Sequence, residues 1–116
     1  MYNNHKKLGF NILKGQKIIS YNKWENGDKS WDFETSERKY NLYIDDEGCG
    51  CNDSNAYIDD IQDLDSILNQ EIIEIDEESD PYGARIKLKT QENECLIVIN
   101  HEQNGYYGFS YELFES

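Results

Sequence analysis

Short runs in which apolar and polar residues alternate follow one another along most of the chain, with turn-forming residues between them. Alternation with a period of two is typical of strands that bury one face. Asn26-Gly27 is a strong hairpin signal, because both turn positions need positive φ, and Asn104-Gly105 marks a further turn. The sequence therefore predicts about five to seven strands. The candidate segments are 17–24, 30–35, 39–44, 71–77, 85–89, 94–99 and 106–114.

One short helix is predicted within about 59–69, between the third and fourth of these segments. Its apolar stripe consists of Ile61, Leu64, Ile67 and Leu68. These spacings place the four side chains on one side of a helix. Asp60 suits the N-cap, and Asp63 and Asp65 suit the first turn, where the positive end of the helix dipole favours carboxylates. Asn69 suits the end of the helix.

The order of elements, three strands, one helix and four strands, predicts an α+β fold. Sequential hairpins favour a mainly antiparallel meander with the helix packed on the sheet, and the alternative is a small open barrel with the helix plugging one end. Segment 94–99 is the most apolar run and is predicted to be the central strand. With 116 residues the chain forms a single domain, 1–116, in which 1–14 is either a loose arm or a short first element.

Composition narrows the class of protein. Aromatic residues make up 13% of the chain, which argues against disorder, and no apolar run is long enough for a transmembrane helix. The first residues lack the apolar stretch of a secretory signal. The chain has three cysteines, Cys49, Cys51 and Cys95. An odd number of cysteines without a signal favours free thiols and a cytoplasmic protein.

Charge is distributed unevenly along the chain, whose net charge is -13. Residues 1–40 hold eight Lys or Arg and five Asp or Glu, whereas 41–116 hold three basic residues and 19 acidic ones. Between Asn41 and Ala84 there are fourteen carboxylates and no Lys or Arg. Such a field repels nucleic acid and anionic membranes and attracts basic protein surfaces. The plainer interpretation is that the acidity only keeps the protein in solution.

No metal site or cofactor is predicted. Cys49-Gly50-Cys51 is not a zinc knuckle, and of the further ligands that zinc would need, Cys95 fits a buried core position better. The other two candidates are His5 and His101. The acidic residues of 45–59 offer oxygen ligands, but they lack the glycine and the terminal glutamate of a calcium loop.

Catalysis is not expected either. The chain has no nucleophile motif and no phosphate-binding glycine loop, and His101 is predicted to be a solvated turn residue. Five aromatic residues crowd the C-terminal strand segment: Tyr106, Tyr107, Phe109, Tyr111 and Phe114. At least half of them are expected in the core, and exposed ones would add contact area for a protein partner.

Five segments carry a resemblance to a known group of proteins. In chain order they are Tyr40-Asn41-Leu42-Tyr43 before the cysteine segment, Tyr57-Ile58-Asp59-Asp60-Ile61 after it, Asp63-Leu64 with the predicted helix ending at Ile67-Leu68, Glu77-Glu78, and Asn104-Gly105-Tyr106-Tyr107. In this order they resemble an uncharacterised family of small acidic proteins encoded mainly by phages and prophages, over roughly 13–114. Family members often have adjacent cysteines and a histidine in the loop, whereas this chain has Cys49-Gly50-Cys51 and no histidine there. The family supplies no activity to carry over.

The resemblance implies a protein that acts inside a host cell. We expect an inhibitor or adaptor that places an acidic surface on a basic surface of a host defence or nucleic-acid-processing protein, in the manner of a nucleic-acid mimic. The predicted contact residues are Asp45, Asp46, Glu47, Asp53, Asp59, Asp60, Asp63 and Asp65. The alternative is a protein that sequesters a small ligand or cyclic nucleotide through aromatic stacking and Lys or Arg. No direct contact with nucleic acid or membrane is expected. The oligomeric state is open, a dimer included.

Overall fold

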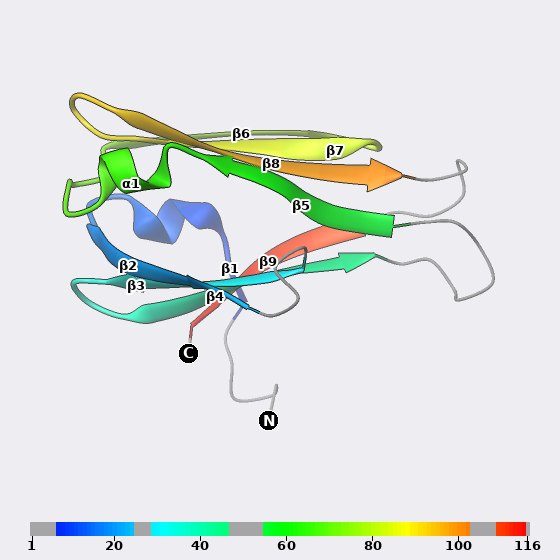
Figure 1. Cartoon of the computed structure of the whole chain (residues 1–116), viewed down its shortest axis with the longest axis horizontal. Helices are drawn as coiled ribbons and strands as arrows, with labels where there is room; N and C mark the ends of the chain where they lie inside the picture. Colours follow the sequence, from blue (N-terminus) through cyan, green and yellow to red (C-terminus); the bar gives the residue numbers. More distant parts are fainter. Residues whose placement is uncertain (1–6, 25–28, 47–54, 103–108, 116) are drawn as a thin grey trace.

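The computed structural model describes residues 7–24, 29–46, 55–102 and 109–115, which form two stacked antiparallel sheets (Figure 1). The first sheet has the order β1-β9-β4-β3-β2 and the second the order β5-β8-β7-β6. The strands of the first sheet are β1 (Lys7–Leu8), β2 (Ile18–Lys23), β3 (Ser30–Thr35), β4 (Lys39–Asp46) and β9 (Phe109–Glu115). Those of the second are β5 (Asn55–Gln62), β6 (Glu74–Asp80), β7 (Gly83–Lys89) and β8 (Glu94–Glu102). The helical elements are the 3-10 turn η2 (Phe10–Leu13) and α1 (Leu64–Ile67).

The predicted mainly antiparallel β-structure with one short helix is confirmed, but two details of the prediction are wrong. The described residues form nine strands rather than five to seven, and these strands make two sheets rather than one. The reason is that the chain crosses from the first sheet to the second after β4 and returns at β9, which pairs with both β1 and β4. Hairpin signals report neighbours in sequence and contain no information about such crossings.

Alternation along β7 and β8 builds the inner face of the second sheet. Ile86 lies opposite Ile97 in the β7–β8 ladder, and both are fully buried. Segment 94–99 is indeed an interior strand, with β5 on one side and β7 on the other. Across the sandwich, the first sheet contributes Phe33 and Leu42 to the same core. Each sheet therefore buries one face and presents the other to solvent.

Strand β5 replaces part of the predicted helix. Ile58 lies opposite Ile99 and Ile61 opposite Ile97, with a bulge between Ile58 and Asp60. The extra residue of the bulge places two core-facing side chains three positions apart, which is also the spacing of a helical stripe. The sequence pattern therefore resembled a helix although the backbone is extended.

The helix itself is a single turn. Asp60 is not its N-cap, since that position is taken by Asp63, which has φ 61° and makes no capping bond with its side chain. Leu64 and Ile67 are buried, as the apolar stripe predicted. Asn69 follows with φ 64°, the left-handed conformation expected where the helix ends.

Residues 7–14, the described part of the N-terminal segment, contain the short strand β1 and the turn η2, and 1–6 lie outside the described residues. Leu8 pairs with Leu113, and the buried side chains of Phe10 and Leu13 fix η2 against the core. The buried Gln16 continues this segment: its amide nitrogen donates to the hydroxyl of Tyr40 at 2.9 Å, and its amide oxygen accepts from Thr35 at 2.6 Å. These bonds satisfy polar groups that would otherwise be buried without partners.

His101 contradicts its prediction as a solvated turn residue. It belongs to β8, is 3% exposed, and its Nδ1 lies 2.9 Å from the carbonyl oxygen of Pro81. Because a carbonyl only accepts, Nδ1 carries the proton of this hydrogen bond. The backbone N–H of His101 also donates to the carbonyl of Tyr82 at 2.9 Å. The β6–β7 turn is therefore fastened to the end of β8.

Gly83, in this turn, has no room for a side chain, because a Cβ there would collide with the backbone carbonyl oxygen of Ile99. We predict that Gly83→Ala lowers the free energy of unfolding by about 1–3 kcal/mol, as in other overpacked sites. Urea denaturation measures it. Gly9→Ala is the matched control, since nothing lies within 4 Å of its Cβ position and φ is -83°. Equal stabilities of the two variants would contradict the prediction.

Candidate partner-binding surface

The predicted contact residues do not form a single patch. Asp59 and Asp60 lie on β5, Asp63 and Asp65 lie at α1, and all four are exposed. Asp45 and Asp46 end β4, at the opposite end of the sandwich from α1 (Figure 1). Glu47 and Asp53 lie outside the described residues. The structure therefore brings together Asp59, Asp60, Asp63 and Asp65, named here the β5–α1 surface.

The carboxylates of the β5–α1 surface have no basic side chain across the ladder. Strand β5 pairs with β8, and the β8 sequence contains no Lys or Arg. Asp60, for example, lies opposite Val98. Within the described part of the chain, none of the four carboxylates forms an ion pair. Their negative charge is therefore available to a partner.

The acidic strand β6 is different, because the register of the β6–β7 ladder places three of its five carboxylates opposite a base. The pairs are Glu74 with Lys89, Asp76 with Lys87 and Glu78 with Arg85. The ammonium group of Lys89 lies 2.9 Å from Asp76 and 3.2 Å from Glu74, and these hydrogen bonds raise its pKa. Much of the charge of β6 is thus compensated within the protein.

An aromatic hollow adjoins the β5–α1 surface. It has a volume of about 410 Å³ and lies between the first sheet and α1. Its lining residues are Tyr21, Trp31, Ile61, Asp63, Leu64, Asp65 and Ser66. Strands β2 and β3 position the two aromatic rings, which stack with their centroids 5.7 Å apart. The hydroxyl of Tyr21 donates to Asp65 at 2.8 Å, which raises the pKa of Tyr21 and joins the first sheet to α1.

The hollow has the composition of a site for a cation. The ammonium group of Lys23 lies 5.9 Å from the ring centroid of Trp31, so a positive charge already faces this aromatic surface. The carboxylates of Asp63 and Asp65 stand at the rim. Sequence reasoning had assigned Tyr21 and Trp31 to strands only. Tyr21 is 44 residues and Trp31 is 34 residues from Asp65 in the sequence, and no local signal could have found this contact.

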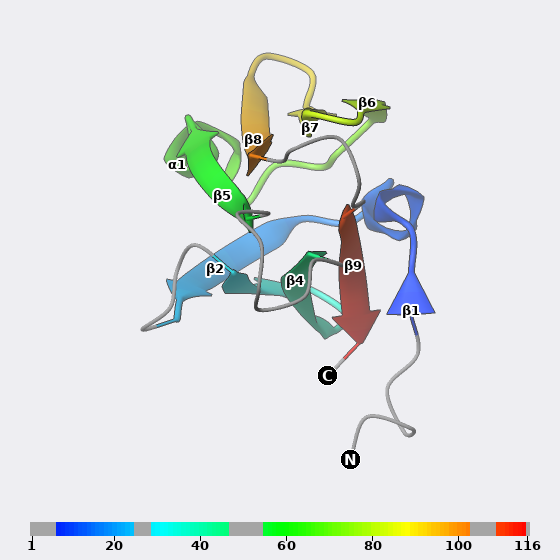
Figure 2. The same cartoon turned by 90° about the vertical axis from the view of Figure 1, so that its right-hand side faces the viewer.

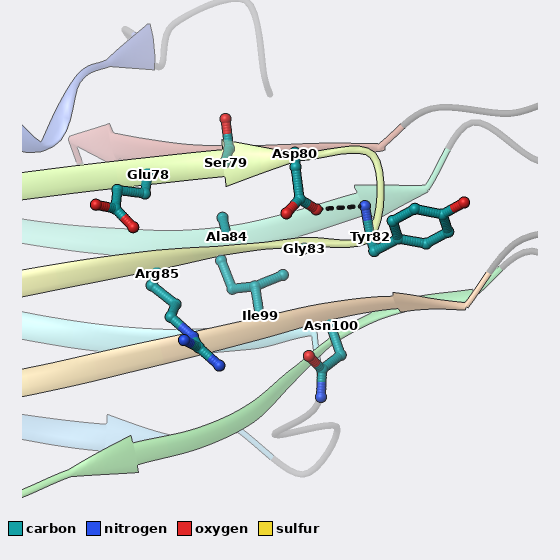
Figure 3. A pocket seen from close by; sticks show the side chains of 9 residues that line it. All are labelled: Glu78, Ser79, Asp80, Tyr82, Gly83, Ala84, Arg85, Ile99 and Asn100. Atoms are coloured by element: carbon teal, nitrogen blue, oxygen red, sulfur yellow. Dashed lines mark hydrogen bonds between the residues drawn. The ribbon is translucent and has the colours of Figure 1, made fainter.

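A second hollow, of about 450 Å³, opens at the β6–β7 turn beside β8 (Figure 3). Asp80, Arg85 and Asn100 line it, and the strongly exposed Tyr82 stands at its end. The backbone N–H of Tyr82 donates to Oδ1 of Asp80 at 2.7 Å, which holds the turn. Both signs of charge meet here, since Glu78 lies opposite Arg85. The hollow is therefore poorly suited to a ligand with strong charge of one sign.

The candidate metal ligands of the described residues lie apart. Cys95 is buried in the core, His101 faces Pro81, and no three His, Cys, Asp or Glu side chains gather among the described residues in a way that could hold a metal ion. His5, Cys49 and Cys51 lie outside those residues. In the same described part of the chain, no helix is both long and apolar enough to cross a membrane.

Cys95 is predicted to be unreactive in the folded protein. Burial raises the pKa of its thiol to about 12, with a further contribution from the charge of Asp63, so the reactive thiolate is scarce at pH 8. In a Cys49→Ser, Cys51→Ser variant, Cys95 is the remaining thiol. We expect Ellman's reagent to label it at pH 8 only as fast as the protein unfolds, and rapidly in 6 M guanidinium. Rapid labelling of the folded variant would show that the site is open.

Comparison with known proteins adds no relative to this description. No family model, no curated protein and no solved structure matches the chain. The resemblance to small acidic phage proteins therefore stays a prediction.

Proposed function

We propose that this protein is a binding protein that uses the β5–α1 surface to engage a basic surface on another protein. The observation that carries the proposal is the difference between two acidic strands. Three carboxylates of β6 lie opposite Arg85, Lys87 and Lys89, whereas β5 has no Lys or Arg across its ladder. Among the described residues, no carboxylate of the β5–α1 surface forms an ion pair. If acidity served solubility alone, the two sets would be equivalent.

Several physical properties of the β5–α1 surface support this role. Uncompensated carboxylates on a rigid strand attract a basic partner over several ångströms and raise its association rate. The adjoining hollow adds apolar and aromatic contact area, which supplies the binding energy that exposed charges lack. Together they make a surface with both long-range attraction and short-range contact.

The kind of partner follows from the charge. A row of carboxylates along one edge of a sheet resembles the row of phosphates in a nucleic acid. Basic surfaces that bind such a row occur on proteins that process nucleic acids, including those that defend a host against foreign nucleic acid. On the resemblance to phage proteins, we propose that the partner is a host protein in the cytoplasm, and that binding there blocks its basic surface without any catalysed reaction.

The alternative role, sequestering a small nucleotide, has less support. A nucleotide needs a cation for its phosphates. The bases of β7 are Arg85, Lys87 and Lys89, and the register places each opposite a carboxylate. The hollow beside Arg85 contains Asp80 as well, whose charge opposes a phosphate (Figure 3).

The proposal predicts a steep dependence of association on charge at one surface. Asp59→Asn, Asp60→Asn and Asp63→Asn together should slow association with a basic protein captured from host lysate by about tenfold or more at low salt. Asn tolerates the left-handed conformation of Asp63, so the fold should persist. Stopped-flow or surface-based kinetics over a salt series measures the effect.

The matched control removes the same charge elsewhere. Glu74→Gln, Asp76→Asn and Glu78→Gln change exposed carboxylates of β6, at the opposite edge of the second sheet from β5, and the on-rate should fall much less. Equal on-rates for both triple variants, or an on-rate that salt does not change, would refute the proposal and favour the solubility role. Thermal unfolding of both variants confirms that each is folded.

A further inference from the structure

The open edge of β2 differs from the other sheet edges. Strand β6 is an edge with five carboxylates, β5 has a bulge followed by Asp60, and β1 is only two residues long. Charges, bulges and short length are the devices that prevent a sheet edge from accepting another strand. Strand β2 is six residues long, and five of its residues are exposed. It has no carboxylate, its one charged residue is Lys23, and its bulge lies at the start of the strand, between Ile18 and Ser20. Its exposed side chains include Ile19 and Tyr21.

Among the described residues, the Ile18 carbonyl is the part of the outer edge of β2 that accepts a backbone hydrogen bond, and the edge beyond it is open to a further strand. At Ile18 the edge is covered, because the N–H of Asn69 donates to the Ile18 carbonyl at 2.8 Å. Further on, the N–H of Trp24 donates to Ser30 of β3. Since backbone groups alternate in direction along a strand, those of Tyr21 and Lys23 point away from β3, to the open edge.

The aromatic hollow lies next to this open edge. Figures 1 and 2 show α1 and β5 in the layer that faces the first sheet, and the hydrogen bond from Tyr21 to Asp65 joins α1 to β2. Side chains of an added strand alternate between the two faces of the sheet. Those on the inner face would therefore meet Tyr21, Asp63 and Asp65.

We propose that the partner engages this protein through an extended basic segment that adds to β2 as a further strand and places alternate Arg or Lys side chains at the aromatic hollow. The inference rests on the proposed function and specifies its partner. Main-chain hydrogen bonds supply affinity in strand addition, and pockets for alternate side chains supply specificity. Carboxylates beside an aromatic ring fit a guanidinium, which can pair with the former and stack on the latter.

Charge favours a basic segment over a second copy of this chain. Each copy has a net charge of -13, and pairing two β2 strands would bring the two β5–α1 surfaces towards each other. The single cation of β2, Lys23, already faces Trp31 within its own chain. An incoming Arg would take over that position and add further positive charge.

The test uses the peptide acetyl-Arg-Val-Arg-Val-Arg-Val-amide and the fluorescence of Trp31 in a Trp24→Phe background, where Trp31 is the remaining tryptophan. Lys23→Pro removes an N–H that points to the open edge and should weaken binding by on the order of tenfold, since strand addition loses a main-chain hydrogen bond. Lys23→Ala retains the N–H and removes the same charge. It should bind the peptide equally or more tightly, because Lys23 no longer competes for the ring.

A second measurement does not depend on how Lys23→Pro folds. The same peptide with N-methyl groups on its three Arg residues keeps its charges and side chains. It lacks the N–H groups on the edge that faces β2 when the Arg side chains point to the hollow. It should bind the parent protein at least about tenfold more weakly. Equal binding of both peptides, or of both Lys23 variants, would overturn strand addition.

The outcomes separate this inference from the proposed function. If neither N-methylation nor Lys23→Pro matters but neutralising Asp59, Asp60 and Asp63 still slows association with the host partner, strand addition is wrong and the proposed function stands. If that neutralisation has no effect either, both fail. Sedimentation that shows a dimer, lost in Lys23→Pro, would make a second copy the occupant and overturn the inference.

Discussion

The structure depends on one apolar layer that two sheets share. The same buried cluster contains Ile86 and Ile97 of the second sheet and Phe33 and Leu42 of the first. Without the other sheet, each would expose its apolar face to water, which is unfavourable. The layer tolerates polar groups only where they are satisfied, as with Gln16 between Tyr40 and Thr35. Packing therefore constrains the side chains that face inward. The groups that can bind a partner are the outward-facing side chains and the backbone of the edge strands.

Strand register decides which of the many carboxylates are available to a partner. The β6–β7 ladder sets acid against base, whereas the β5–β8 ladder sets Asp60 against Val98. A chain with a net charge of -13 thus has one internally compensated acidic strand and one uncompensated surface. The distinction is a matter of neighbours in space, because both strands come from the same stretch of the chain that lacks Lys and Arg.

Besides outward-facing side chains, the open edges of the two sheets can bind a partner. Open sheets expose unpaired backbone groups that pair with other chains unless something prevents it. Here the protecting features, carboxylates, a bulge and short length, occur on β6, β5 and β1. Strand β2 has none of these apart from the bulge near Ile18, and it adjoins both the uncompensated carboxylates and the aromatic rings. Backbone, charge and aromatic surface therefore meet at one place.

The sequence by itself determined the local pieces: the strand at Ser30–Thr35, the interior position of 94–99, the buried thiol of Cys95 and the acidity of 59–65. Period and turn chemistry act over a few residues, so a sequence reveals them. Only the tertiary structure decided that Ile58 and Ile61 face the core from a bulged strand, that His101 is buried against Pro81, and that Tyr21 and Trp31 stand beside Asp65. Each of these depends on a partner strand or turn distant in sequence, and hydrogen bonding and burial with that partner outweigh local preference.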